Sequence, residues 1–235
     1  MNRWQAIVFD LDDTLYPERD YALSGFRAVA NWADLRLGIP AEQGYAELRR
    51  MFEQGVRGDT FNRWLAAHGV PADDWIKELV QVYRTHIPVL TPFPEVPALL
   101  AALRPHYRIG LVSDGYLDVQ RQKFAALRLA EYFDAVVFSD EWGREAWKPS
   151  TFPFERVAQM LGVTPRRAMY VADNPTKDFL GARRAGLTTV WCRRAHGEYT
   201  HLEPPTDEHG PDWSIPSLAA FESILSRLEN SAQIT

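Results

Sequence analysis

The pattern of hydrophobic and polar positions alternates between short apolar runs and longer stretches with helical spacing. Five short runs, bounded by polar or turn-forming residues, have the composition of strands that are buried on both faces of a parallel sheet. These predicted strands cover residues 6–9, 109–112, 135–138, 168–172 and 187–192. Helical spacing is found near residues 116–127, 152–161, 176–185 and 218–228. Because strands and helices alternate from residue 109 onward, we expect a parallel α/β sheet with helices on both faces.

The segment from Pro17 to Pro92 interrupts this alternation, because its apolar residues recur at helical spacing. Glycine-containing turns near residues 38–40, 58–59 and 69–71 divide it into about four predicted helices. We therefore expect residues 17–92 to form an all-helical domain, inserted into an α/β core of residues 1–16 and 93–235. Prolines crowd the return path and predict either a stiff hinge or an ordinary loop; they are Pro88, Pro92, Pro94 and Pro97.

Composition and charge narrow the class of protein. The 235 residues are 46% hydrophobic and 24% charged, which is typical of a globular domain. The net charge is −5 and no run of Lys and Arg concentrates positive charge, so we expect no nucleic-acid partner. Cys192 is the only cysteine, which excludes an internal disulfide and a thiolate zinc site and favours a reducing compartment. Without a signal-peptide layout or an apolar run of ~20 residues, we expect a cytoplasmic protein with no membrane partner.

An acidic cluster follows the first predicted strand, in the sequence Asp10-Leu11-Asp12-Asp13-Thr14. Side chains alternate in an extended segment, so Asp10 and Asp12 are expected to point the same way. Two carboxylates this close raise each other's pKa unless they share a proton or bind a cation. Oxygen ligands without His or Cys favour Mg²⁺ over zinc. Taken alone, however, Asp and Thr are also common helix caps and turn residues.

Polar residues also stand at the ends of other predicted strands. Ser113 ends the second strand, Lys148 follows the third, and Asp173 and Asp178 follow the fourth. The carboxyl ends of parallel strands share one edge, where ligands of open α/β folds bind. A hydroxyl and an ammonium at that edge suit a phosphoryl group beside a metal. Each residue also has an ordinary interpretation, as a turn serine, a solvated lysine, or an acid in the first turn of a helix.

Taken in order, these residues resemble the four motifs of the haloacid dehalogenase (HAD) superfamily of phosphohydrolases. The motif segments are residues 10–15, 112–115, 148–149 and 171–178, and the resemblance spans residues 6 to about 192. A helical insertion after the first motif is similar to the C1-type cap of subfamily I. The resemblance implies a HAD-like Rossmannoid parallel sheet with helices on both faces, plus an inserted all-helical cap domain that selects the substrate.

The resemblance also implies roles for individual residues. Asp10 is the nucleophile that forms an aspartyl-phosphate, and Asp12 is the acid–base residue. Mg²⁺ is held by the Asp10 carboxylate, the Asp12 backbone carbonyl and Asp173, with Asp178 in or just behind the coordination shell. The implied phosphate-binding residues are Thr14, Ser113, Asp114, Gly115 and Lys148, with Asn174 in support. Two residues depart from the common pattern of the superfamily, Asp114 in place of Asn and Ala172 in place of Gly. Because the Asp114 carboxylate would repel phosphate, we expect the backbone amides of Asp114 and Gly115 to contact it.

The carboxylate of Asp12 favours a phosphatase, since the dehalogenases of this superfamily lack an acid there. The expected activity is Mg²⁺-dependent hydrolysis of a small phosphomonoester of the nucleoside monophosphate or sugar phosphate class. A phosphomutase is less favoured, because Asp13 stands where mutases commonly have Gly. A haloacid dehalogenase or a phospho-receiver or binding module stays open, although receivers are shorter and lack a cap. The expected partner is a small phosphorylated metabolite, and the expected assembly is a monomer or homodimer.

Other motifs add little to this picture. Residues 181–186 carry the two glycines of a P-loop, but Leu187 and Thr188 follow where that motif has Lys and Ser or Thr. No GxGxxG sequence follows a predicted strand, so a dinucleotide cofactor is not expected. Residues 203–216 are rich in proline and polar residues and predict a surface loop. Candidate substrate contacts in the helical segment, each also typical of core or solvated surface, are Arg19, Tyr21, Arg57, Phe61, Arg63 and Trp64.

Overall fold

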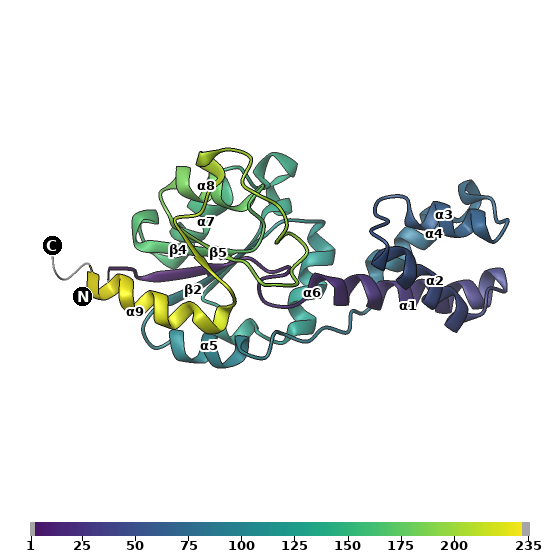
Figure 1. Cartoon of the computed structure of the whole chain (residues 1–235), viewed down its shortest axis with the longest axis horizontal. Coiled ribbons are helices and arrows are strands. Elements are labelled where there is room, and N and C mark those ends of the chain that lie inside the picture. The colour runs from purple at the N-terminus through teal and green to yellow at the C-terminus, as the bar shows by residue number, and fades with distance from the viewer. Residues whose placement is uncertain (1–2, 232–235) are drawn as a thin grey trace. The chain divides into compact units, whose positions relative to one another are not determined.

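The computed structural model describes residues 3–231 and separates the chain into two compact units (Figure 1). One unit consists of Met1–Glu18 and Thr91–Thr235, and the other of Arg19–Leu90. The first contains a sheet and its flanking helices, and the second is entirely helical in its secondary structure. Within the described part of the chain, no helix combines the length and the apolar character needed to cross a membrane.

Six parallel strands form the sheet in the order β3-β2-β1-β4-β5-β6. Their bounds are β1 Ala6–Phe9, β2 Arg108–Ser113, β3 Ala135–Phe138, β4 Ala168–Ala172, β5 Thr188–Cys192 and β6 Trp213–Ile215. All residues of β1 and β4 are buried, as the apolar runs predict. The first five strands and the parallel α/β fold are therefore confirmed. The sixth lies within residues 203–216, so the expectation of a loop there is wrong for Trp213–Ile215.

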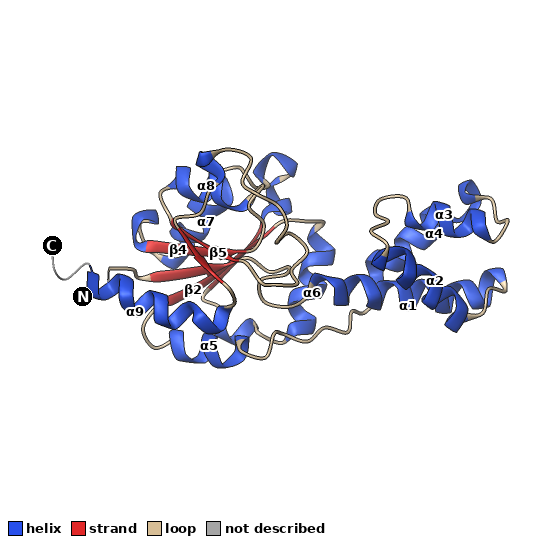
Figure 2. Cartoon of the chain, viewed as in Figure 1, coloured by secondary structure: helices blue, strands red, loops and turns tan. Residues whose placement is uncertain are grey.

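Helices cover both faces of this sheet, as predicted (Figure 2). Those of the core are α5 Val96–Leu103, α6 Leu117–Leu127, α7 Phe152–Leu161, α8 Asp178–Ala185 and α9 Phe221–Ser231. Short 3₁₀ helices are Ala130–Tyr132, Ser139–Trp142, Arg144–Ala146, Pro165–Arg167, Asp207–His209 and Leu218–Ala220. On one face, Phe154 of α7 and Phe179 of α8 pack on Val8 and Tyr170 of the sheet. On the other, the rings of Phe9 and Phe221 lie 6.1 Å apart.

The helical unit contains α1 Glu18–Leu37, α2 Ala41–Glu53, α3 Thr60–Ala67 and α4 Ala72–Thr85. The first residue of α1, Glu18, belongs to the other unit. Its core is formed by apolar residues from each helix: Phe26, Val29, Leu48, Trp64 and Leu79. Several of the candidate substrate contacts serve this unit itself. Trp64 is fully buried and donates to Glu47 at 2.8 Å, and Arg63 pairs with Asp59 at 2.7 Å. The Arg57 guanidinium lies 3.7 Å from the centre of the Phe52 ring.

Candidate active site

Three adjacent strands of the sheet, β2, β1 and β4, bring several of the predicted site residues to one edge. Asp10 directly follows β1, Ser113 ends β2, and Asp173 directly follows β4. In the sheet register, Phe9 pairs with Leu111 of β2 and with Val171 of β4. The Asp10 amide then donates to the Val171 carbonyl at 2.9 Å, which extends the pairing by one residue. Parallel pairing thus explains why residues more than 100 positions apart meet here.

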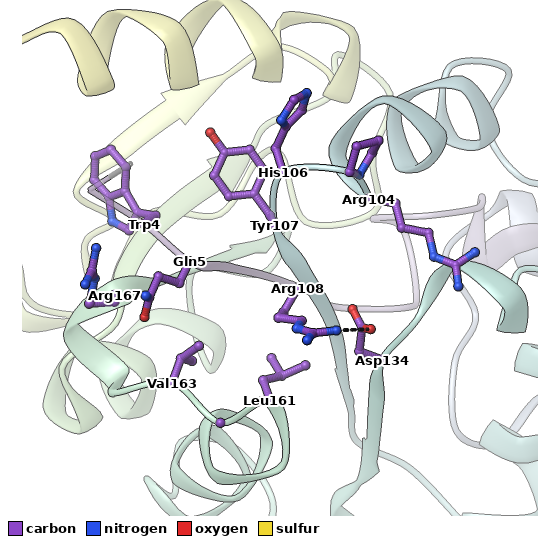
Figure 3. Close-up of a pocket in the computed structure, with 12 residues that line it drawn as sticks. Trp4, Gln5, Arg104, His106, Tyr107, Arg108, Asp134, Leu161, Val163 and Arg167 are labelled. Atoms are coloured by element: carbon purple, nitrogen blue, oxygen red, sulfur yellow. Dashed lines mark hydrogen bonds and ion pairs between the residues drawn. The ribbon is translucent and has the colours of Figure 1, made fainter. Parts of the chain in front are cut away.

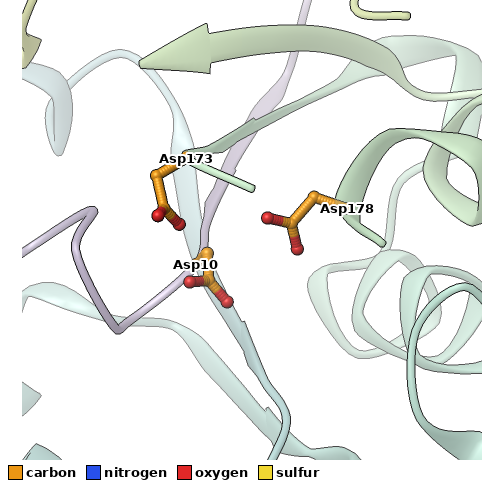
Figure 4. Close-up of side chains that lie close together, drawn as sticks. All are labelled: Asp10, Asp173 and Asp178. Carbon is orange, nitrogen blue, oxygen red and sulfur yellow. The ribbon is translucent and has the colours of Figure 1, made fainter. Parts of the chain in front are cut away.

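Asp10, Asp173 and Asp178 form a buried carboxylate cluster at this edge (Figure 4). Each contributes an oxygen, and these oxygens lie within 4.8 Å of one another. Asp173 Oδ1 accepts a hydrogen bond from Thr14 at 3.4 Å, but its Oδ2 is buried and has no partner among the described residues. Burial and the Asp178 and Asp10 charges raise the pKa of Asp173 well above its usual value. An unsatisfied buried oxygen among three carboxylates fits a hard divalent cation.

Lys148 is the positive charge inside this cluster. Its Nζ donates to Asp10 at 2.6 Å, to Asp178 at 2.7 Å and to the Tyr170 hydroxyl at 3.0 Å, and its side chain is fully buried. Burial favours the neutral amine, but Asp10 and Asp178 outweigh it and raise the pKa of Lys148 well above its usual value. For Asp10, burial dominates over the attraction of Lys148 and raises the pKa to about 6. Asp10 is therefore ionised at neutral pH and held against an ammonium.

The end of β2 and the loop that follows it present a hydroxyl and a glycine to the same region. Ser113 Oγ is buried and unpaired among the residues that the structure describes, so this hydroxyl is available to hydrogen-bond a ligand. The Asp114 carboxylate, by contrast, accepts hydrogen bonds from Ser139 Oγ at 2.5 Å and from the Lys148 amide at 3.0 Å. The Asp114 carboxylate therefore connects the 3₁₀ helix Ser139–Trp142 to the segment that carries Lys148, and both of its oxygens accept hydrogen bonds. Gly115 has φ +133°, a conformation that favours glycine.

Asp12 has a separate set of partners. Its Oδ1 accepts hydrogen bonds from Lys123 Nζ at 2.8 Å and from the Tyr16 hydroxyl, and its Oδ2 accepts from Gln120 Nε2 at 2.8 Å. Burial acts to raise the pKa of Asp12, but the Lys123 charge and these hydrogen bonds outweigh it and lower the pKa. The Asp12 backbone carbonyl accepts from the Thr14 amide at 2.7 Å. The carboxylate is therefore ionised and held on both oxygens.

Asp13 has a backbone role. Its φ of 49° is left-handed, a conformation that Gly adopts freely and Asp tolerates better than most residues. Its carboxylate accepts from the Glu18 amide at 2.8 Å, at the start of α1, and from the Glu198 amide at 2.9 Å. The choice between Asp and Gly at this position therefore reflects turn geometry as well as reaction type, which weakens the sequence argument against a phosphomutase.

Several residues of the site were not predicted from the sequence. The unpredicted contacts come from Tyr16, Gln120, Lys123 and Tyr170. Gln120 and Lys123 carry a signal that could have revealed them, because they stand three positions apart on α6 and so share one face of the helix. Both are buried, whereas polar residues on a surface helix are usually exposed. Tyr170 lies inside β4, where a buried hydroxyl requires a partner.

A hollow of about 880 Å³ lies at the opposite edge of the sheet (Figure 3). It is lined by residues at or near the starts of strands, among them Gln5, Arg108 and Arg167. Arg104 and Arg108 are exposed there, and Arg108 pairs with Asp134 at 3.2 Å. The carboxylate cluster, the buried lysine and the unpaired Ser113 hydroxyl are all at the carboxyl edge, where we therefore place the candidate active site.

The chain is similar to a described protein family and to several named proteins. The family described as haloacid dehalogenase-like hydrolase matches residues 7–192. The glyceraldehyde 3-phosphate phosphatase of Methanopyrus kandleri is 34% identical over 220 residues, which are 90% of this chain and 92% of that protein. The pyrimidine 5'-nucleotidase YjjG of Escherichia coli is 26% identical, over 96% of this chain and 99% of that protein.

The same fold is found in solved structures. The putative HAD-hydrolase YfnB of Bacillus subtilis superimposes with a TM-score of 0.69 at 21% identity, covering 95% of this chain and 99% of that one. The family match covers residues 7–192 and so includes all four motif segments, from the acids after β1 to those after β4. The chain therefore belongs to the haloacid dehalogenase-like hydrolases.

Proposed function

We propose that this protein is a phosphoric monoester hydrolase that uses Mg²⁺ and forms an aspartyl-phosphate on Asp10. The observation that carries the proposal is the position of Asp10, which is buried between the Lys148 ammonium and the carboxylates of Asp173 and Asp178. The names of the relatives support it, because the glyceraldehyde 3-phosphate phosphatase and the pyrimidine 5'-nucleotidase are both hydrolases of small phosphomonoesters.

Asp10 acts as the nucleophile in the proposed reaction. One of its carboxylate oxygens attacks phosphorus, the bond from phosphorus to the ester oxygen breaks, and Asp12 gives a proton to the departing oxygen. Because Asp12 is ionised in the free protein, it takes up that proton from solvent first. Asp12 then removes a proton from the water that attacks the aspartyl-phosphate, and inorganic phosphate leaves with Asp10 restored.

The groups around Asp10 supply the positive charge that this attack needs. Asp10, Asp173 and the Asp12 backbone carbonyl would hold Mg²⁺, with Asp178 in or just behind the coordination shell. When bound, the ion neutralises charge that would otherwise repel a phosphate dianion from a carboxylate. Lys148 and the Ser113 hydroxyl bind phosphoryl oxygens, and Gly115 and the Asp114 backbone shape the loop that receives them. Thr14 orients Asp173 through its hydrogen bond.

The substrate is a small phosphorylated metabolite of the sugar phosphate or nucleoside monophosphate class. The helical unit of Arg19–Leu90 is proposed as the cap that selects the leaving group. The first relative is named for a phosphorylated three-carbon aldehyde and the second for pyrimidine nucleotides, so both classes belong in the test panel.

Phosphate release from a substrate panel tests the proposal. The panel contains glyceraldehyde 3-phosphate, pyrimidine nucleoside monophosphates and p-nitrophenyl phosphate, each with Mg²⁺ and with EDTA. We expect turnover that requires Mg²⁺. We expect Asp10→Asn to lower it by a factor of at least about 10³, because an amide cannot form the aspartyl-phosphate. Circular dichroism checks that the variant is folded.

Two results would contradict the proposal. Substantial phosphate release by folded Asp10→Asn would remove Asp10 as the nucleophile. Halide release from chloroacetate without Mg²⁺, together with silence across the phosphate panel, would favour a dehalogenase instead.

A further inference from the structure

Two buried polar side chains of α6 contact the Asp12 carboxylate. Gln120 and Lys123 are 2% and 4% exposed, and they lie three positions apart on the same face of the helix. A buried ammonium is costly unless it is paired, and a buried amide is costly unless it is hydrogen-bonded. The face of α6 that carries them is therefore organised around a specific polar contact.

This contact holds both oxygens of Asp12. Lys123 Nζ donates to Oδ1 and Gln120 Nε2 donates to Oδ2, each at 2.8 Å. The Tyr16 hydroxyl donates to Oδ1 from the loop that Asp12 itself belongs to. Donors that reach a carboxylate from two elements restrict its rotation about the χ angles more than one donor does. The orientation of Asp12 is thus fixed by two residues of α6, Gln120 and Lys123, which lie 108 and 111 positions later in the chain.

Gln120 also connects Asp12 to the loop that follows β2. The same Nε2 donates to the backbone carbonyl of Asp114. A Cβ built on Gly115 would lie 2.7 Å from this nitrogen, so the glycine permits the close approach of the amide. One side chain therefore links the acid–base residue to the backbone of the proposed phosphate-binding loop.

We propose that Lys123 and Gln120 are positioning residues that hold Asp12 in line with the leaving oxygen of the substrate. This inference rests on the proposed function, in which Asp12 donates a proton as the phosphorus–oxygen bond breaks. Proton donation needs a heavy-atom distance of about 2.6–3.2 Å, and a displacement of about 1 Å costs about 10²-fold in rate. The proton moves from an Asp12 oxygen to the leaving oxygen, which departs as a neutral alcohol.

The dependence of kcat/KM on the leaving group distinguishes a positioning role of Lys123 and Gln120 from a purely structural one. p-Nitrophenolate is a stable anion that leaves without a proton, whereas phenol and glycerol need one. If Lys123 and Gln120 only hold α6 in place, their loss lowers the rates for all substrates together. If they position Asp12, their loss lowers kcat/KM selectively for the substrates with poor leaving groups. Because kcat/KM reports the steps through formation of the aspartyl-phosphate, later hydrolysis does not mask the difference.

The experiment compares kcat/KM for p-nitrophenyl phosphate, phenyl phosphate and glycerol phosphate in the full chain with Mg²⁺. The variants are Lys123→Met and Gln120→Met, which keep similar length and remove the donors. Asp12→Asn is the reference for complete loss of the acid, and Arg121→Met is the control. Arg121 belongs to the same helix, but its ion pair with Glu141, at 2.7 Å, is 54% and 32% exposed.

We expect Lys123→Met to lower kcat/KM for phenyl and glycerol phosphate by about 10²-fold and for p-nitrophenyl phosphate by less than about 5-fold. Gln120→Met should show the same selectivity with a smaller loss, since Lys123 and Tyr16 remain. Arg121→Met should change no substrate by more than about 2-fold. Should Lys123→Met fail to fold, Gln120→Met alone carries the comparison.

Equal losses for the three substrates in folded variants, or no loss in either variant, would overturn the positioning role. That outcome is distinct from a failure of the proposed function itself, in which the unmodified protein shows no Mg²⁺-dependent turnover or Asp10→Asn retains it. A variant that loses activity equally while Asp12→Asn is selective would assign Lys123 and Gln120 to the packing of α6.

Discussion

Asp10 combines two properties that oppose each other in a folded protein. It is buried, with an exposed fraction of 4%, and it must be ionised to attack phosphorus. Burial and the neighbouring Asp178 raise its pKa to about 6, although Lys148 acts in the opposite direction. The carboxylate is therefore available at neutral pH, and keeping it ionised costs the folded state free energy.

This cost predicts a pH-dependent effect of Asp10→Asn on stability. The pKa of about 6 in the folded state lies above the usual 3.8, so the contribution of Asp10 to stability is fully present below pH 3.8 and is lost as the pH rises through 6. The loss is at most roughly 3 kcal/mol, from about 1.4 kcal/mol per pKa unit. In EDTA, we expect Asp10→Asn to unfold at higher urea than the unmodified protein at pH 7.5, but not at pH 4.

Asp34→Asn is the matched control, because Asp34 is an exposed residue of α1. It should change the urea midpoint neither at pH 7.5 nor at pH 4. Equal urea midpoints for Asp10→Asn and the unmodified protein at pH 7.5 would show that the buried carboxylate is not destabilising.

The elements of the core are connected by close backbone approaches as well as by side chains. Helix α8 carries Asp178 at its first position and Gly181 one turn later. A Cβ on Gly181 would lie 2.6 Å from the backbone carbonyl oxygen of Ser150, in the loop that supplies Lys148. Glycine is therefore needed so that α8 can approach this loop, and the approach brings Asp178 to 2.7 Å from Lys148. This close approach accounts for Gly181, which the comparison of residues 181–186 with a P-loop left unexplained.

Gly181→Ala is accordingly predicted to destabilise the protein. Alanine normally stabilises a helix over glycine by about 0.5–1 kcal/mol. Here the added methyl group meets backbone atoms that cannot rotate away, so we expect a loss of about 1–3 kcal/mol in the free energy of unfolding. Because α8 and the Lys148 loop must separate, kcat/KM should fall as well. Urea unfolding and phosphate release measure the two effects.

Arg184→Ala serves as the control on the same helix, because its ion pair with Glu208 is exposed and removing it should change stability by less than about 0.5 kcal/mol. A more stable and fully active Gly181→Ala protein would contradict the packing argument.

Across the whole chain, the charged groups of the site are concentrated in one of the two units. The carboxylate cluster belongs entirely to the unit that contains the sheet, and none of its members belongs to Arg19–Leu90. A cation that binds the folded cluster stabilises the unit that forms it, by about 2.7 kcal/mol at 100 times the dissociation constant.

We therefore expect Mg²⁺ to slow hydrogen exchange at amides of β1 and β4 while leaving α2, α3 and α4 unchanged. Asp173→Asn, which removes a proposed ligand, should abolish the protection without unfolding the protein. Exchange rates that do not respond to Mg²⁺ in the unmodified protein would argue against metal binding at this cluster.

The elements that could be predicted from the sequence are those marked by a pattern within a short, continuous segment. Strands β1 to β5 were predictable because residues buried on both faces of a sheet form continuous apolar runs. Strand β6 was not, since Trp213 and Ser214 are exposed and leave no such run. Helix α5 was also missed, in a segment where Pro94 and Pro97 were interpreted only as a hinge or loop. Three of the motif residues were recognisable because Asp10 and Asp173 directly follow strands and Ser113 ends one.

The sequence by itself determined the fold class, the family, and the residues that meet at the carboxyl edge of the sheet, because these depend on short segments and on the shared direction of parallel strands. Only the tertiary structure decided how those residues are used. It pairs Lys148 with Asp10 and Asp178, turns the Asp114 carboxylate onto Ser139, and brings Lys123 to Asp12. Such contacts join residues far apart in the chain, and they depend on side-chain orientation and burial, which sequence spacing does not encode.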